Sequence, residues 1–118
     1  MRKIDEYKQL IDDLVVIRPS VLVRWVKEKG WPETPENEKI NQFLSSLTHD
    51  QKEILADIVQ QARDGGIHDV LVKLNDKISI DDYRITVNGE ELPVEPFGTQ
   101  LYFDWTCRSE GDDWPEPE

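Results

Sequence analysis

The chain contains a single cysteine, Cys107, so no internal disulfide framework holds it together. It also lacks an unbroken run of about 18 apolar residues, the length that a membrane-spanning helix needs. The opening segment Met1–Tyr7 contains two acids and no apolar core, unlike a secretory signal peptide. These absences predict a cytoplasmic protein that does not associate with a membrane.

Basic side chains are scarce in the second half of the sequence. Residues 1–47 hold eight basic and eight acidic side chains, whereas residues 48–118 hold six basic and seventeen acidic ones. The second half therefore carries the whole formal net charge of −11. Such a field repels phosphates, which argues against nucleic acid as a ligand, and it steers a basic partner. We expect a basic protein partner.

Motifs for binding a cofactor or a metal ion are missing. Gly65-Gly66 does not stand in the strand–GxxxxGK[ST]–helix context of a phosphate-binding loop. The acids Asp76, Asp81 and Asp82 do not have the spacing of a calcium-binding EF-hand. The sequence therefore predicts no cofactor and no metal ion.

A catalytic reading remains as an alternative. His68, Asp69 and Cys107 supply an imidazole, a carboxylate to orient it and a thiol, which are the groups of nucleophilic catalysis. No known local signature surrounds them. A packing cysteine and surface histidines are the simpler interpretation.

The clearest helix signal begins at Thr48. Thr48 and Gln51 have the spacing of a capping box, and Gly65-Gly66 favours a left-handed helix cap. Between them, apolar residues follow a 3.6-residue period on one face: Ile54, Leu55, Ile58, Val59 and Ala62. The pattern predicts a helix that ends at the glycine pair and whose apolar face is the seam between two halves of the chain.

Apolar residues at helical spacing predict four further helices. They lie at about residues 2–17, 19–30, 35–47 and 67–75. A buried strand is the alternative for the last one, because Val70-Leu71-Val72 is also strand-like. The stripes within Ile4–Val15 and Val21–Val26 also suit a homodimer interface.

The period changes after residue 76. Tyr83, Ile85 and Val87 alternate with polar residues, and Asn88-Gly89 is the preferred pair for a type I′ turn, so we expect a hairpin. A lone hairpin is only marginally stable in water. We therefore favour a third strand over Leu101–Arg108, and a helix there is the alternative.

The predicted fold class is α+β and mostly helical. About five helices are followed by a small antiparallel β-hairpin or three-stranded sheet, all in a single domain over residues 1–118. The domain comprises a helical part at residues 1–75, a β-rich part at residues 76–110 and an acidic tail at residues 111–118.

Acids and one tryptophan gather near the C-terminus. A tryptophan in a tail either packs back onto the protein or contacts a partner. The candidate partner-binding residues are Asp104, Arg108, Asp112, Asp113 and Trp114.

Several segments of the second half resemble small bacterial proteins of unknown function. They are Ala62–Leu71, Phe97-Gly98, Asp104-Trp105, Arg108 and Gly111–Pro115. The resemblance implies a bacterial origin and carries no activity with it.

The leading functional hypothesis is a non-enzymatic interaction or inhibitor protein. It would neutralise a basic partner, as an immunity protein or an antitoxin does. The alternatives are a structural or regulatory subunit of a homo-oligomer, and a small enzyme that uses His68, Asp69 and Cys107.

Overall fold

The computed structural model describes residues 2–115 and divides the chain into two compact units. Unit 1 comprises Met1–Ile17 and Gly66–Glu118, and unit 2 comprises Arg18–Gly65. The long helix α4 (His49–Ser79) contributes residues to each unit. The α+β, mostly helical fold class is confirmed, with a single two-stranded antiparallel sheet among the described residues.

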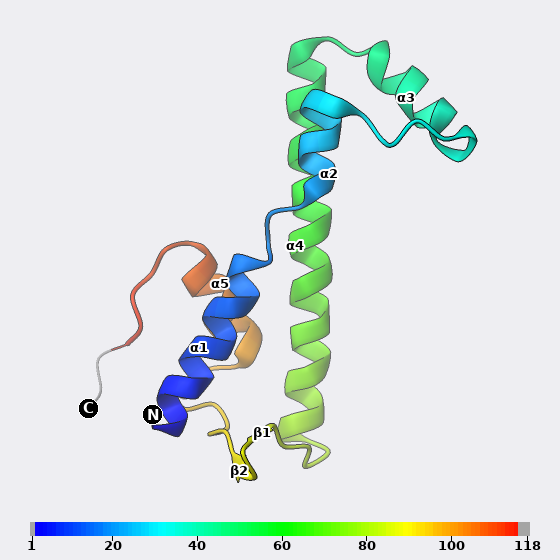
Figure 1. Ribbon diagram of the computed structural model, residues 1–118. Coiled ribbons are helices and arrows are strands. Elements are labelled where there is room, and N and C mark those ends of the chain that lie inside the picture. The colour runs from blue at the N-terminus through cyan, green and yellow to red at the C-terminus, as the bar shows by residue number, and fades with distance from the viewer. Residues whose placement is uncertain (1, 116–118) are drawn as a thin grey trace. The chain divides into compact units, whose positions relative to one another are not determined.

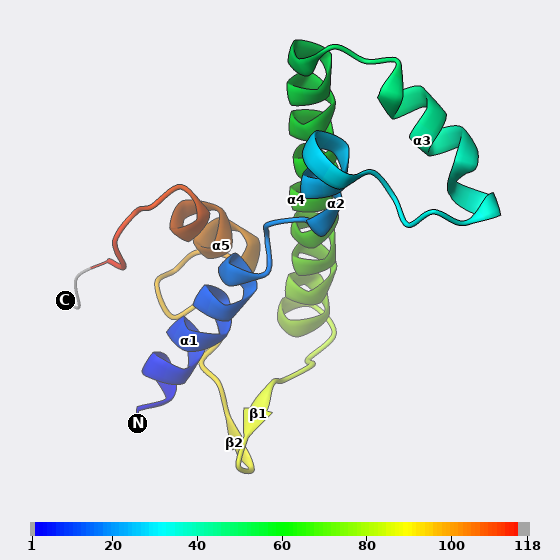
Figure 2. The same cartoon turned by 45° about the horizontal axis from the view of Figure 1, so that its top comes forward.

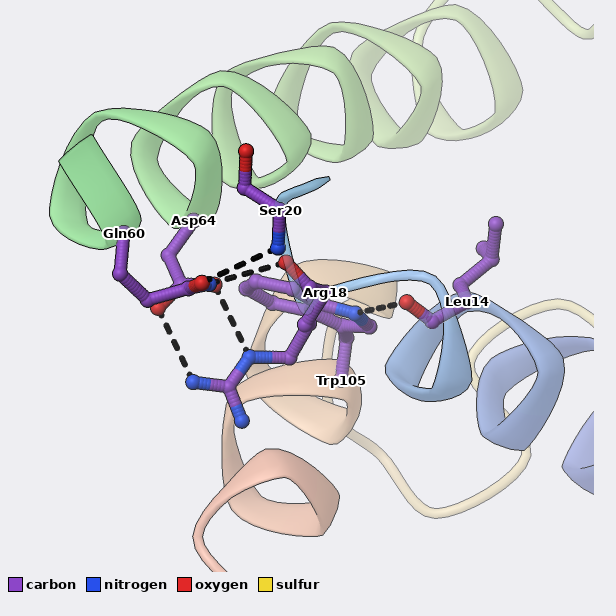
Figure 3. Close-up of polar contacts among 6 residues, drawn as sticks. All are labelled: Leu14, Arg18, Ser20, Gln60, Asp64 and Trp105. Atoms are coloured by element: carbon purple, nitrogen blue, oxygen red, sulfur yellow. Dashed lines mark hydrogen bonds and ion pairs between the residues drawn. The ribbon is translucent and has the colours of Figure 1, made fainter. Parts of the chain in front are cut away.

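Unit 1 is built around α1 (Lys3–Val16) and α5 (Leu101–Ser109). The two helices lie side by side in both views (Figures 1 and 2), and the indole of Trp105 donates a hydrogen bond to the Leu14 carbonyl at 3.0 Å (Figure 3). The C-terminal part of α4 completes the core. Its buried apolar residues are Tyr7, Ile11, Leu71, Ile78, Leu101 and Trp105.

The predicted hairpin is confirmed, although its strands are short. Strands β1 (Thr86–Val87) and β2 (Glu90–Glu91) pair antiparallel. Asn88 and Gly89 both have positive φ, 53° and 81°, as a type I′ turn requires. Beyond the strands, the Leu92 amide donates to the Ile85 carbonyl at 2.8 Å, and the buried Leu92 side chain anchors the hairpin.

Unit 2 contains four short helical segments and the N-terminal part of α4. Helix α2 (Val21–Arg24) continues as a π-helical turn, η1 (Trp25–Lys29), and the 3₁₀ turn η2 (Pro35–Asn37) leads into α3 (Glu38–Ser45). Its core consists of Val26, Leu44 and Ala56, with Val23, Trp31, Leu47, Leu55 and Val59 packed against them.

Polar contacts fasten the segment before α2 to α4 within unit 2. The Arg18 guanidinium makes a bidentate pair with Asp64, at 3.0 and 2.9 Å. Gln60 donates to the Arg18 carbonyl at 2.9 Å and accepts from the Ser20 amide at 3.2 Å (Figure 3). The Gln60 side chain thus satisfies two backbone groups just before α2, the Arg18 carbonyl and the Ser20 amide, while the ion pair joins side chains only.

Helix α4 begins as predicted but does not end as predicted. The Thr48 hydroxyl accepts from the Gln51 amide at 3.2 Å, and the Gln51 side chain accepts from the Thr48 amide at 2.9 Å, which confirms the capping box. The helix then runs through Gly65-Gly66 to Ser79 (Figure 1). The prediction of a cap at the glycines, with a separate helix after them, is therefore wrong. Ile67, Leu71 and Leu74 pack into the core of unit 1, and this burial outweighs the weak helix propensity of glycine.

The expected apolar seam along α4 is also wrong. Leu55 and Val59 pack into the core of unit 2, but Ile54 and Ile58 are 62% and 56% exposed. The buried face is centred on Ala56, which lies about half a turn away from Ile54 and Ile58 because each residue advances a helix by about 100°.

The third strand expected over Leu101–Arg108 is a helix, α5, so the β-rich part at residues 76–110 holds only the four strand residues of the hairpin. Leu101 and Trp105 are buried, whereas Phe103 between them is 49% exposed. A four-residue spacing satisfies both the strand period of two and the helix period of 3.6, which is why the alternation misled the prediction.

Candidate functional site

Helix α5 places two sets of side chains on different faces. Leu101 and Trp105 enter the core, and the Leu101 amide donates to the Asn75 side chain of α4 at 3.0 Å, which fixes the start of the helix. Phe103, Cys107 and Arg108 line a pocket instead. The four-residue spacing of Phe103 and Cys107 puts these two on one side of the helix, and Arg108 follows Cys107 in the chain.

The pocket has a volume of about 250 Å³. Its second wall is the segment that follows α5, together with the loop that precedes the helix. The lining residues are Phe97, Thr99, Phe103, Asp104, Cys107, Arg108, Asp112, Asp113, Trp114 and Pro115. All five candidate partner-binding residues therefore lie around one pocket of unit 1.

Arg108 holds the segment after α5 against α1. Its guanidinium makes a bidentate pair with Asp12, at 2.8 and 3.1 Å, and donates to the Asp112 carbonyl at 2.8 Å. Planar guanidinium groups suit such a fork, because two parallel N–H donors match the two carboxylate oxygens. Arg108 is thus fully engaged within the fold and positions the pocket wall.

Trp114 packs back onto the body of unit 1. Its ring stacks on Phe97 with a centroid distance of 5.3 Å and meets Tyr7 edge-on at 6.3 Å. Two cations also lie near the indole, the Arg108 guanidinium at 5.0 Å and the Lys8 ammonium at 5.9 Å from the ring centroid. This aromatic cluster therefore already attracts cations by cation–π interactions.

Asp104 sits at the base of the pocket and is 6% exposed. Its carboxylate accepts hydrogen bonds from the Tyr7 and Thr99 hydroxyls. Burial raises the pKa of Asp104, although the two hydroxyls lower it, and burial also raises the pKa of Tyr7. The contacts of Asp104 give it a role in holding α1, α5 and the preceding loop together.

Asp112 and Asp113 differ from Asp104 because they are exposed at the pocket rim.

Cys107 also lines the pocket. Desolvation raises the pKa of its thiol, with further contributions from Asp112 and Glu110. A raised pKa makes a thiol a poorer nucleophile at neutral pH, because the thiolate is the reactive form.

The groups of the catalytic alternative do not share this pocket. His68 and Asp69 lie on α4, where their side chains are 3.8 Å apart and that of Asp69 is 86% exposed. The His68 imidazole packs edge-on against Tyr102, at 5.4 Å between centroids. The lining of the pocket beside α5 includes Cys107 but neither His68 nor Asp69, so the three groups are not brought together there.

Residues 2–115 contain neither a cluster of metal-binding side chains nor a helix suited to cross a membrane. No group of three or more histidine, cysteine, aspartate or glutamate side chains is placed to hold a metal ion. No helix in that range has both the length and the apolar character that crossing a membrane demands.

Unit 2 contains a larger and more open groove of about 720 Å³. Trp25 and Trp31 line it, with their rings edge to face at 5.4 Å. Asn41 fixes the Trp31 backbone through two hydrogen bonds, at 2.8 and 3.0 Å. The charged lining residues are mixed, with Glu28, Glu33 and Glu38 beside Lys29 and Lys52. This mixture does not indicate one class of ligand.

The division into units sharpens the charge asymmetry. Unit 2 holds seven basic and eight acidic side chains, a net charge of −1. Unit 1 holds seven basic and seventeen acidic side chains, a net charge of −10. Nearly all of the surplus charge therefore belongs to the unit that contains the pocket beside α5.

The fold and the pocket define a small, acidic, mostly helical α+β protein. This protein belongs to the family of unknown function DUF6547, whose model matches residues 1–116. Comparisons with curated proteins and with solved structures found no match. The expectation of a family of unknown function is thus confirmed.

Sequence reasoning missed the apolar half of the pocket. Phe97 and Phe103 are not among the candidates, and the sequence suggests Cys107 only as a packing residue or a nucleophile. A helical reading of residues 101–109 would have placed Phe103 beside Cys107 and Asp104 beside Arg108, since both pairs are spaced as i and i+4.

Proposed function

We propose that this protein is a non-enzymatic interaction protein of the bacterial cytoplasm that binds and neutralises a basic protein partner, in the manner of an immunity protein or an antitoxin. The charge of unit 1 carries the proposal, because −10 of the formal net charge of −11 lies there. A field of one sign raises the rate of encounter with a partner of opposite sign. The resemblance of the second half to small bacterial proteins supports the origin.

The pocket beside α5 marks where contact would be made. Its rim carries the exposed carboxylates of Asp112 and Asp113, and its wall carries aromatic rings. Aromatic residues are enriched at protein interfaces, while charged groups at the rim govern the rate and salt dependence of association.

The test is a pull-down with the full chain from a lysate of the source bacterium, at about 50 mM and about 500 mM salt. Exposed charges are screened beyond roughly 4–14 Å at these ionic strengths. We expect a basic protein to be retained at low salt and released at high salt. Failure to retain a basic protein, or retention that salt does not weaken, would contradict the proposal.

A matched pair of variants locates the contact. Asp112→Asn with Asp113→Asn removes two rim charges, and Glu33→Gln with Glu36→Gln removes two exposed charges of unit 2. Both pairs of substitutions change the net charge by the same amount, so only the position of the lost charges differs. Because the contact is proposed at the pocket rim, we expect the first pair to weaken retention by roughly 5- to 10-fold and the second to weaken it less than 2-fold. Equal losses would show that overall charge, and not the pocket rim, attracts the partner.

Self-association is a second candidate function, favoured by one observation. Ile54 and Ile58 are more than half exposed and stand one turn apart on α4, whereas much of the expected homodimer interface, including Tyr7, Ile11 and Val26, is buried within the units. If the exposed pair is an interface between copies, light scattering of the wild-type chain will show a dimer that dissociates on dilution. The change Ile54→Gln with Ile58→Gln will then leave a monomer at every concentration. A wild-type monomer throughout would exclude this candidate.

A further inference from the structure

We infer that the pocket beside α5 receives a single arginine side chain of the basic partner. The guanidinium would stack on Phe103 and form ion pairs with Asp112 and Asp113. This inference rests on the proposed function and names the group that the pocket recognises.

The size of the pocket limits its occupant. Sites for small molecules and cofactors usually have volumes of about 300–1,000 Å³, and this pocket has about 250 Å³. One long side chain that enters from a partner needs less space than a cofactor, because the rest of the partner stays outside.

The lining favours a cation, because its charged residues are acidic apart from Arg108, whose guanidinium is paired with Asp12. Phe103, Phe97 and Trp114 give the pocket aromatic walls. Phe103 is 49% exposed and lies outside the buried core of unit 1. An aromatic face attracts a cation through the ring quadrupole. The exposed carboxylates of Asp112 and Asp113 attract a cation as well, through their negative charge.

The surrounding cluster shows the same mode of recognition within the chain. Arg108 lies 5.0 Å from the Trp114 ring centroid while its guanidinium forms a fork with Asp12. Lys8 lies 5.7 Å from the Phe97 centroid. Those two rings are therefore already occupied by internal cations, which leaves Phe103 for an incoming one.

Arginine fits better than lysine. Its guanidinium is planar, stacks on aromatic rings and offers paired N–H donors to a carboxylate, whereas an ammonium is a compact and strongly hydrated charge. The flat Phe103 ring beside the carboxylates of Asp112 and Asp113 suits a guanidinium better than an ammonium. The experiment should therefore measure how well the pocket discriminates between arginine and lysine.

The experiment titrates the ¹⁵N-labelled full chain with blocked tetra-arginine, tetra-lysine and tetra-citrulline peptides at low salt, followed by amide NMR. Citrulline keeps the shape of arginine without its charge. We expect tetra-arginine to shift amide signals within residues 103–114, tetra-lysine to bind at least roughly 3-fold more weakly, and tetra-citrulline to cause no shifts. Equal binding of the arginine and lysine peptides would overturn the inference.

Phe103→Ala tests the stacking directly, with Phe43→Ala as its control. Phe43 is 56% exposed but belongs to unit 2. We expect Phe103→Ala to weaken tetra-arginine binding by roughly 2- to 5-fold and Phe43→Ala to leave it unchanged. Equal effects of the two variants would overturn the inference. If the pull-down still retains a basic partner in that case, the proposed function stands and only the arginine pocket fails.

Discussion

Replacement of Asp104 by alanine is expected to lower the free energy of unfolding by about 3 kcal/mol, because it leaves two hydroxyl groups without their acceptor. Tyr7 and Thr99 both donate to this carboxylate, and Tyr7 is 2% exposed, so water does not readily replace the lost acceptor. Urea denaturation of the wild-type and variant chains measures the change. Asp113→Ala, at an exposed position, is the control and is expected to change the free energy by no more than about 0.5 kcal/mol.

A double-mutant cycle separates the Tyr7–Asp104 contact from other effects of the substitution. Tyr7→Phe removes the hydroxyl and keeps the ring, which packs against Phe97 and Trp114. The double variant is expected to lose about 1 kcal/mol less than the sum of the two single losses, because residues in direct contact couple. Strict additivity would show that the hydrogen bond contributes nothing to stability.

The contribution of Asp104 to the free energy of unfolding also depends on pH, and the direction of this dependence follows from its pKa. Burial is the largest influence and raises the pKa of this carboxyl above that of an ordinary aspartate. The folded protein thus binds the proton more tightly than the unfolded chain does. The stability that this group contributes is present in full below the ordinary aspartate pKa and is lost as the pH rises through the raised one. The stability gap between wild type and Asp104→Ala should therefore narrow from acidic pH towards neutrality, and a gap that widens would contradict this assignment.

The second large effect concerns Gly65 and Gly66, whose replacement by alanine is expected to stabilise the protein. Both residues lie inside α4, and an added Cβ at either position meets no atom within 4 Å. Glycine in a helix interior costs roughly 0.5–1 kcal/mol relative to alanine, because it loses more conformational freedom on folding. The double variant should gain about 1–2 kcal/mol in the free energy of unfolding, measured by urea denaturation.

The sign of this change distinguishes two local structures. A left-handed glycine cap at residue 65 or 66, which the sequence pattern favours, would make alanine destabilising because its Cβ is strained at positive φ. Gly111 supplies the matched control. Its φ is 91° and a Cβ there also meets nothing within 4 Å, so Gly111→Ala isolates the conformational cost and should destabilise by about 1 kcal/mol.

Local signals in the sequence proved accurate where the chemistry is local. The Thr48–Gln51 capping box and the Asn88-Gly89 turn both form as expected, since each depends on residues within four positions of one another. Ile4, Tyr7 and Ile11 likewise predicted α1, which spans Lys3–Val16.

Composition identified the candidate binding residues, but it did not show how they are arranged in space. Acidic charge and a tail tryptophan pointed to Asp104, Asp112, Asp113 and Trp114, and Arg108 lies among them in the sequence. All five line one pocket. Sequence alone did not show that Asp104 is buried and holds Tyr7, or that Arg108 is engaged by Asp12. Asp12 and Arg108 are 96 residues apart, so the contact exists only once α1 and α5 are packed.

The sequence by itself determined a mostly helical α+β fold, the helix start at Thr48, the hairpin turn and the acidity of the second half. Only the tertiary structure decided that α4 continues through Gly65-Gly66 and that residues 101–109 form a helix. The reason is the same in both places. Glycine propensity and the period-two alternation are weak local preferences, whereas burial of Ile67, Leu71, Leu101 and Trp105 in unit 1 removes large apolar side chains from water.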